Sequence, residues 1–327
     1  MRDIGIDLGT TNILIYVKGK GVVLNEPSVV SVDTNTKKVL AVGKEAKEML
    51  GRTPGKVKAI RPMKDGVIAD FDTTEEMLNQ FMKKALGKRL LSKPRILICC
   101  PSNITGVEKN AIREMAEKMG ARRVFLEEEP KVAAVGAGID IAKPSGSMVI
   151  DIGGGTTDIA VLSLGGIVTS DSIRIAGNTF DEEIANYIKD KYKVIIGEKT
   201  SEDIKTSIGT VSNKNKEKTL EVTGRSIATG LPETITVTSK DVEEALKDNI
   251  KKIITSVKSV LEKTPPELAA DISNKGIILT GGGSLIDGLV EKLRKELKVP
   301  VFISDNPLTN VVEGTGILLE NLHLIDN

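Results

Sequence analysis

Short apolar runs separated by glycine-rich turns fill the first part of the chain and return near its middle. Residues 4–17 contain two such runs joined by Gly9-Thr10-Thr11, and a third run extends through Val32. Three comparable runs occupy residues 148–175, with a Gly-Gly-Gly turn after the first. Alternating or apolar runs bounded by turn residues predict β-hairpins. The pattern therefore predicts two β-meanders and indicates an internal duplication.

Strand-like and helical patterns alternate between and after the two meanders, which predicts an α/β fold. We expect Ser284 to be the N-cap of the last helix, after a third glycine-rich turn. The strand patterns cover residues 95–100, 124–126, 219–223, 234–238 and 277–279, and the helical patterns cover residues 105–120, 130–137, 180–191, 241–263 and 285–297.

Length and composition narrow the class of protein. The 327 residues exceed one ordinary domain and predict two lobes. A net charge of +1 and an aromatic content of 2% without tryptophan argue against nucleic acid as a partner. The adjacent Cys99 and Cys100 lie in a predicted strand and would point to opposite faces, so we expect no disulfide and a reducing cytoplasm. No apolar run reaches the roughly 18 residues that span a bilayer, so any membrane contact should be peripheral.

The two glycine turns carry the chemistry of a phosphate site. Glycines let backbone N–H groups approach an anion, and threonine hydroxyls add donors. Thr10, Thr11 and Asn12 form one such turn. Aligned on the paired threonines, the second turn, residues 153–157, contains two extra glycines. For a single turn of this kind, a hairpin that needs positive φ is the better explanation, but two copies with matching carboxylates favour phosphate binding.

Each predicted first strand ends in a carboxylate, Asp7 in one copy and Asp151 in the other. A buried carboxylate is costly unless it meets a cation or hydrogen-bond donors. A hydrated Mg²⁺ beside nucleotide phosphates would satisfy both groups. The alternative is that each aspartate caps its own glycine turn.

Four segments of the chain carry the candidate chemistry: Ile6-Asp7-Leu8-Gly9-Thr10-Thr11-Asn12, Glu128-Glu129-Pro130, Asp151-Ile152-Gly153-Gly154-Gly155-Thr156-Thr157-Asp158 and Thr280-Gly281-Gly282-Gly283-Ser284. They resemble the nucleotide motifs of the actin and heat-shock-chaperone ATPase superfamily, and the match is closest to its MreB/Mbl family.

The resemblance covers nearly the whole chain and implies an actin-like α/β fold: two duplicated lobes, each with a mixed sheet flanked by helices, two small subdomains, and a nucleotide cleft between the lobes. The implied division is residues 1–32, 72–142 and 310–327 for the first lobe core, 33–71 for its small subdomain, 143–177 and 242–309 for the second lobe core, and 178–241 for its small subdomain.

The resemblance also implies roles for individual residues in ATP binding and hydrolysis. Glu129 would orient the attacking water with help from Thr156, although an acidic residue is also favoured in any first helical turn. Asp151, and less directly Asp7, would hold Mg²⁺ through water. The β-phosphate side would be contacted by Thr10, Thr11 and Asn12, and the γ-phosphate side by Gly153, Gly154, Gly155 and Thr156. The adenosine would lie against Gly281, Gly282, Gly283 and Ser284, with Glu202 and Lys205 near the ribose and base. Gly177 is also implied to bind the nucleotide. For Glu202 and Lys205 the alternative is a solvated helix face.

The sequence departs from the family pattern in residues 201–209, where a more apolar and acidic form is usual, and at two single positions outside the phosphate motifs. Asn178 stands where an acidic residue is common, and Lys131 where an apolar one is common. Leu90 and Leu91, flanked by basic residues, resemble the family's membrane-insertion loop; the alternative is that both leucines pack in the core.

The resemblance implies a cell-shape cytoskeletal ATPase that polymerises with itself on the anionic inner face of the cell membrane. It also implies partners among the cell-wall synthesis and shape-determining membrane proteins. The alternatives are a non-polymerising chaperone-type ATPase or a division-associated relative that binds ATP without hydrolysing it. A chaperone would need a substrate-binding domain after Asn327, and a sugar or acetate kinase would need a catalytic carboxylate and a sugar pocket for which we find no candidate.

Overall fold

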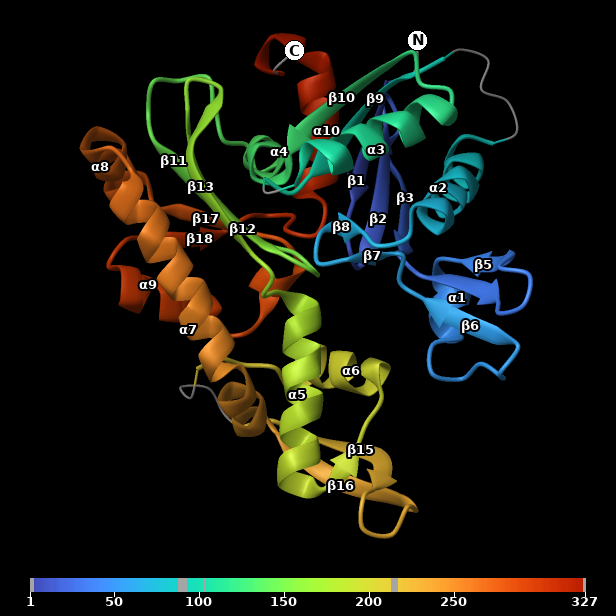
Figure 1. Cartoon of the computed structure of the whole chain (residues 1–327). Coiled ribbons are helices and arrows are strands. Elements are labelled where there is room, and N and C mark those ends of the chain that lie inside the picture. The colour runs from blue at the N-terminus through green and yellow to red at the C-terminus, as the bar shows by residue number, and fades with distance from the viewer. Residues whose placement is uncertain (1–2, 88–92, 103, 213–216, 326–327) are drawn as a thin grey trace.

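Two five-stranded sheets with the same topology form the two halves of the molecule (Figure 1). The computed structural model describes residues 3–87, 93–102, 104–212 and 217–325. One sheet has the order β10-β9-β1-β2-β3 and the other β18-β17-β11-β12-β13. In both, the first strand of the meander is antiparallel to the second and parallel to a strand from later in the chain. The predicted duplicated α/β architecture is therefore confirmed.

Most of the predicted elements lie where the hydrophobic pattern placed them. The strands are β1 (Asp3–Leu8), β2 (Asn12–Val17), β3 (Gly21–Pro27), β4 (Val30–Asp33), β5 (Val39–Val42), β6 (Val57–Ile60), β7 (Met63–Lys64), β8 (Val67–Ile68), β9 (Arg95–Cys100), β10 (Arg123–Glu128), β11 (Ser147–Ile152), β12 (Thr157–Ser163), β13 (Gly166–Ile173), β14 (Val194–Ile195), β15 (Thr219–Ser226), β16 (Pro232–Thr238), β17 (Ile277–Thr280) and β18 (Val301–Ile303). The helices are α1 (Lys44–Glu48), α2 (Phe71–Leu86), α3 (Gly106–Lys118), α4 (Glu129–Gly136), α5 (Gly177–Tyr192), α6 (Glu198–Ile208), α7 (Ser239–Lys263), α8 (Pro266–Lys275), α9 (Leu289–Leu297) and α10 (Asn310–Glu320), with short 3₁₀ turns η1 (Gly282–Leu285) and η2 (Leu322–Leu324).

The two hairpins have equal lengths, which corrects the alignment that gave the second one two extra glycines. Leu8 pairs with Ile13 in the first hairpin, and Ile152 pairs with Thr157 in the second. Four residues separate the two residues of this last pair in each hairpin, so Gly9-Thr10-Thr11-Asn12 corresponds to Gly153-Gly154-Gly155-Thr156. Matching threonine with threonine misled the alignment, because the hydrogen-bond register of a hairpin fixes the equivalence of positions.

Two predicted elements were wrong in detail. The run through Val32 is not one strand: β3 ends at Pro27, and β4 begins at Val30 in a different sheet. Proline lacks the N–H group that would continue the ladder. Ser284 does not cap a long helix; it lies in η1, its hydroxyl donates to the Gly281 carbonyl at 2.6 Å, and α9 begins only after Gly288.

Helices α4 and α10 lie between the two large sheets (Figure 1). Their apolar side chains share one core with both sheets, for example Val132 and Leu318 with Leu97 and Val149. The helices cross very closely, since a Cβ on Gly314 would overlap the Val132 carbonyl. The two lobes are therefore joined through a packed helical layer.

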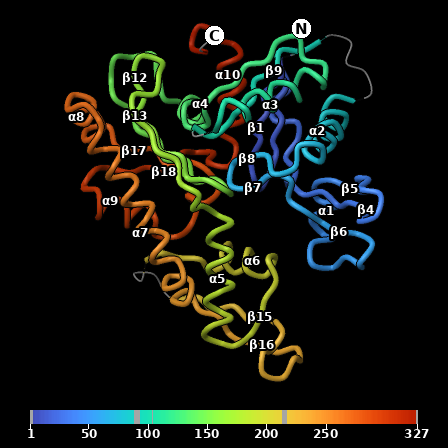
Figure 2. The backbone as a smooth tube through the Cα atoms, in the orientation of Figure 1, coloured from blue at the N-terminus to red at the C-terminus, as the bar shows by residue number. Residues whose placement is uncertain are grey.

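Two small sheets project from the large ones on the side away from the chain termini (Figure 2). The first small sheet has the order β5-β4-β6 and packs against α1, and the second has the order β14-β15-β16 and lies beside α5 and α6. Among the described residues, no helix is long and apolar enough to cross a membrane. Both cysteines are buried and free, as predicted.

Candidate functional site

The turns of the two hairpins face each other across the lobes. A Cβ built on Gly154 would overlap the Thr11 hydroxyl, and one on Gly155 would crowd the side chain of Thr10. Each threonine of the first turn therefore lies against a glycine of the second turn. This approach depends on glycine, because any larger residue at 154 would push the hairpins apart. The structure thus brings together the two predicted phosphate turns.

Two further turns surround this meeting point. Gly66, between β7 and β8, donates its N–H to the Thr10 hydroxyl at 2.8 Å, and a Cβ on Gly66 would lie close to Thr156. The third glycine-rich turn follows β17, and a Cβ on Gly281 would overlap the Asp151 carboxylate. Gly66 and Gly281 therefore lie in close contact with side chains of the two hairpins.

The N-terminus of α5 docks on the second hairpin. Its first two N–H groups, those of Gly177 and Asn178, donate to the carbonyls of Gly153 and Gly154 at 3.1 and 2.8 Å. Thr11 of the first lobe donates its hydroxyl to the Asn178 side-chain oxygen at 3.0 Å, which adds a bond between the lobes. The Asn12 amide, in contrast, donates to Asn25 on the neighbouring strand at 2.7 Å.

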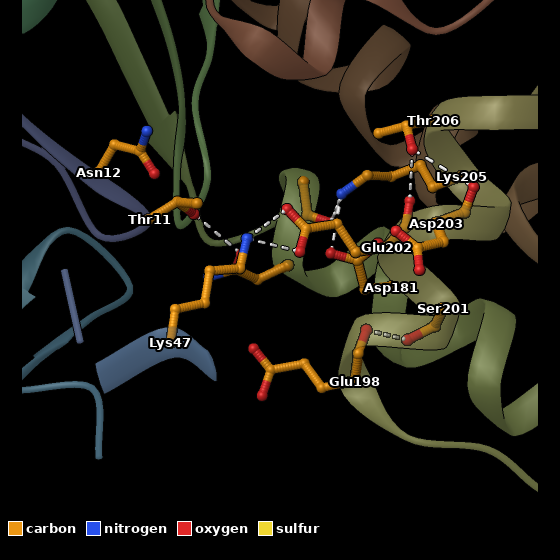
Figure 3. Close-up of polar contacts among 12 residues, drawn as sticks. Thr11, Asn12, Lys47, Asp181, Glu198, Ser201, Glu202, Asp203, Lys205 and Thr206 are labelled. Atoms are coloured by element: carbon orange, nitrogen blue, oxygen red, sulfur yellow. Dashed lines mark hydrogen bonds and ion pairs between the residues drawn. The ribbon is translucent and has the colours of Figure 1, made fainter. Parts of the chain in front are cut away.

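Lys205 and Glu202 of α6 both make specific contacts (Figure 3). Lys205 donates to the Gly177 carbonyl at 2.9 Å and pairs with Asp181 at 2.8 Å, one turn into α5. Glu202 pairs at 2.8 Å with Lys47 of α1, in the other lobe. Both side chains are half-buried, so neither lies on a fully solvated helix face.

Four carboxyl groups gather behind the facing turns: Asp7 at the end of β1, Asp151 and Asp158 on the paired strands β11 and β12, and Glu129 at the start of α4. Burial raises the pKa of Asp7 to about 7. Burial and then the charges of Asp158, Asp7 and Asp151 hold the pKa of Glu129 well above its usual range. The pKa of Asp151 is raised well above its usual range in the same way.

This cluster fits a bound cation. Within the described ranges, no lysine or arginine forms an ion pair with any of the four carboxylates. The same part of the chain contains no set of three acidic, histidine or cysteine side chains close enough to ligate a metal directly. A hydrated divalent cation, held through water, matches both observations because it compensates the charge without direct protein ligands.

The raised pKa of Asp7 predicts that the free protein loses stability as pH rises toward neutrality and above. In the unfolded chain this carboxyl ionises near 3.8, whereas in the folded protein it keeps its proton up to about 7. The folded state therefore binds more protons in this window, and the free energy of unfolding falls as pH rises through it. In metal-free and nucleotide-free protein, Asp7→Asn should raise the melting temperature at pH 8 by about 3 °C or more and leave it nearly unchanged at pH 4.

Thermal unfolding followed by circular dichroism at both pH values measures this effect. The exposed Asp305 provides the control, and Asp305→Asn should change neither melting temperature. An equal gain at pH 4 and pH 8 would assign the effect of Asp7→Asn to packing rather than to ionisation.

One member of the cluster was missed as a site residue. Asp158 is almost fully buried, and burial raises its pKa, although the neighbouring polar groups of Thr156 and Ser172 act in the opposite direction. It closes the second glycine-threonine motif, but only the strand pairing places it beside Asp151. Leu90 and Leu91 lie outside the described residues.

Comparison with known proteins gives matches along the whole chain. A family model for the MreB/Mbl protein matches residues 1–327. The cell shape-determining protein Mbl of Bacillus cereus is 64% identical over 321 residues, which cover 98% of this chain and 96% of that protein. The cell shape-determining protein MreB of Escherichia coli is 50% identical over 328 residues, which cover 99% and 94%. MreB5 of Spiroplasma citri, solved with ADP and with AMPPNP, is 41% identical with a TM-score of 0.94, and the match covers 98% of this chain and 97% of that one.

Proposed function

The chain belongs to the MreB/Mbl family, and on this premise we propose that it is an ATP-hydrolysing cytoskeletal protein that forms membrane-associated filaments and helps to maintain cell shape. The actin-like fold expected from the motifs is confirmed by the match to MreB5 over nearly the full length of both chains. The cell-shape role is supported by the names of the Mbl and MreB relatives.

The facing hairpins carry the proposal of ATP binding. Their turns bring glycine backbone and threonine side chains from both lobes together at one place, next to an acidic cluster. Triphosphate is the ligand class that needs donors on several sides and a cation at the same time. The ADP and AMPPNP complexes of MreB5 support the same ligand class.

The phosphates would be shared between the lobes. Thr10, Thr11 and Asn12 of the first hairpin are proposed to contact the β-phosphate side, and the turn from Gly153 to Thr156 the γ-phosphate side. The Thr10 hydroxyl already accepts a hydrogen bond from the Gly66 N–H, and the Thr11 hydroxyl donates one to the Asn178 side chain. Nucleotide binding would therefore exchange these hydrogen bonds for bonds to phosphate oxygens.

Some residues of the acidic cluster are proposed to hold the cation, and one is proposed to orient the attacking water. Asp151, with Asp7, would hold Mg²⁺ through water, and the ion would supply charge neutralisation for the phosphates. Glu129 would accept a hydrogen bond from the attacking water and orient it with Thr156. This role requires the ionised carboxylate. A cation held by Asp151 and Asp7 would offset the negative charges that raise the pKa of Glu129 and would so favour the ionised form.

The adenosine is proposed to lie between the third glycine turn and α6. This turn lies next to β11, and an added Cβ would overlap Asp151 and Ile152 at Gly281 and would overlap Ile152 at Gly283. Gly177, Glu202 and Lys205 lie on the α5 and α6 side of the hairpins. The division of the chain into four subdomains, with a nucleotide cleft between the lobes, stays a prediction.

Self-assembly, membrane attachment and partners complete the proposal. We expect filaments at the inner face of the cell membrane that engage cell-wall synthesis and shape-determining membrane proteins. Electron microscopy and phosphate release with Mg²⁺-ATP test the central claim together. Absence of both filaments and ATP turnover in the purified protein would refute it.

Leu90 and Leu91 are the proposed membrane contact. Replacing both with serine should release the protein from anionic liposomes, because each inserted leucine is worth about 1.5–3 kcal/mol and filaments multiply the contacts. Co-sedimentation with anionic and neutral liposomes measures this, and circular dichroism checks the fold. Serine at the exposed Leu40 and Leu164 is the matched control and should leave binding unchanged. Undiminished sedimentation of the Leu90/Leu91 variant would place those leucines in the core instead.

A further inference from the structure

Two ion pairs connect the first small sheet to helix α6 of the other lobe. Lys47 of α1 lies 2.8 Å from one carboxylate oxygen of Glu202 and 3.0 Å from the other (Figure 3). Arg61, directly after β6, donates its Nε–H to Glu198 at 2.9 Å, and its Nη2 contacts the same oxygen. The pairs join residues separated by 155 and 137 positions in the chain, so they form only when the lobes are folded against each other.

Helix α6 presents the two acids as a unit. Glu198 and Glu202 are four residues apart and therefore lie on one face of the helix. Ser201, Ile204 and Ile208 on another face are buried and fix α6 to its own lobe. The acidic face is consequently turned toward Lys47 and Arg61, which come from different elements of the first lobe.

The position of α6 is linked to the second phosphate turn. Lys205 of the same helix bonds to the Gly177 carbonyl, and the Gly177 N–H bonds to the Gly153 carbonyl. A short chain of contacts thus runs from Glu202 through α6 and the start of α5 to the glycine hairpin. Displacing α6 would disturb the hairpin without touching a phosphate-contacting residue.

We propose that Lys47 and Arg61 are positioning residues: through Glu202 and Glu198 they hold α6 against the first lobe and so slow the escape of bound nucleotide. This inference rests on the proposed nucleotide site but does not require hydrolysis. All four side chains are partly exposed, so salt screens the pairs. Nucleotide dissociation should therefore accelerate with ionic strength, by about two- to fivefold for each pair that is lost.

A charge swap at Arg61 and Glu198 tests the inference, because neither residue is placed in the binding set. Release of a fluorescent ATP analogue, chased with unlabelled ATP, is followed by stopped flow at low and high salt. Arg61→Glu and Glu198→Arg should each accelerate release about fivefold or more at low salt, since reversal adds repulsion. The double swap should return the rate to within about twofold of wild type.

A second ion pair, Lys258–Glu296 within the second lobe, is the matched control. Lys258→Glu should leave release unchanged. Unaltered release in both Arg61→Glu and Glu198→Arg, or no rescue by the double swap, would overturn the inference. If the wild-type protein fails to bind the analogue, the proposed function fails. The interlobe contact is then tested by the radius of gyration in solution. The single charge reversals should increase this radius, and the double swap should restore it. An unchanged radius would overturn it.

Discussion

Glu129→Ala is expected to lower ATP turnover by about 10²-fold or more while ATP binding is retained. Glu129 begins α4 immediately after β10, so both a strand end and a helix start fix its position. Its partly buried carboxyl lies in the field of Asp7, Asp151 and Asp158. Removing it deletes the proposed acceptor for the attacking water but none of the groups that would hold the phosphates, so the loss should fall on the chemical step.

Phosphate release at saturating Mg²⁺-ATP and equilibrium binding of a fluorescent analogue separate the two effects. Glu129→Gln keeps the shape of the side chain and should lose turnover to a similar degree, which would identify charge as the important property. Glu128→Ala, one residue earlier at the N-cap of α4, is the neighbouring control and should turn over nearly normally. Wild-type turnover in Glu129→Ala would remove this residue from the mechanism.

The sequence predicted the elements of the site because its strongest signals are local. A strand that ends in aspartate, a glycine turn and paired threonines are all read within about ten residues, and both copies fold as the expected hairpins. The helical pattern over residues 105–120 likewise predicted α3, which begins at a capping box formed by Thr105 and Glu108. Local motifs were sufficient for these features because hairpins and helix caps are stabilised by near neighbours.

Features that depend on distant contacts were missed. The equivalence of Thr10 with Gly154 follows from the strand register, and an alignment that matched identical residue types concealed it. Asp158 joined the acidic cluster only through pairing with Asp151. The Lys47–Glu202 contact has no periodic signal, since the two residues come from different lobes. In each case the relevant neighbour is set by the tertiary fold and not by nearby sequence.

Gly154→Val should weaken nucleotide binding by about 10- to 10²-fold, since overpacking a close contact costs about 1–3 kcal/mol. Even the Cβ of a residue at 154 would overlap the Thr11 hydroxyl, and the valine methyl groups would extend the overlap. The adjacent Gly155 offers no room for a compensating shift, because it is crowded by Thr10 and Asp65. The hairpins would then meet too far apart for one triphosphate to contact both.

Binding of a fluorescent ATP analogue, together with circular dichroism of the free protein, distinguishes this effect from misfolding. Gly166→Val is the matched control: Gly166 lies in the same sheet, its added Cβ meets open space, and valine there should bind normally. Gly154→Ala, which adds only the Cβ, should fall between wild type and Gly154→Val and serves if the valine variant does not fold. Wild-type affinity in a folded Gly154→Val protein would mean that the two glycine-threonine turns do not act on the same ligand.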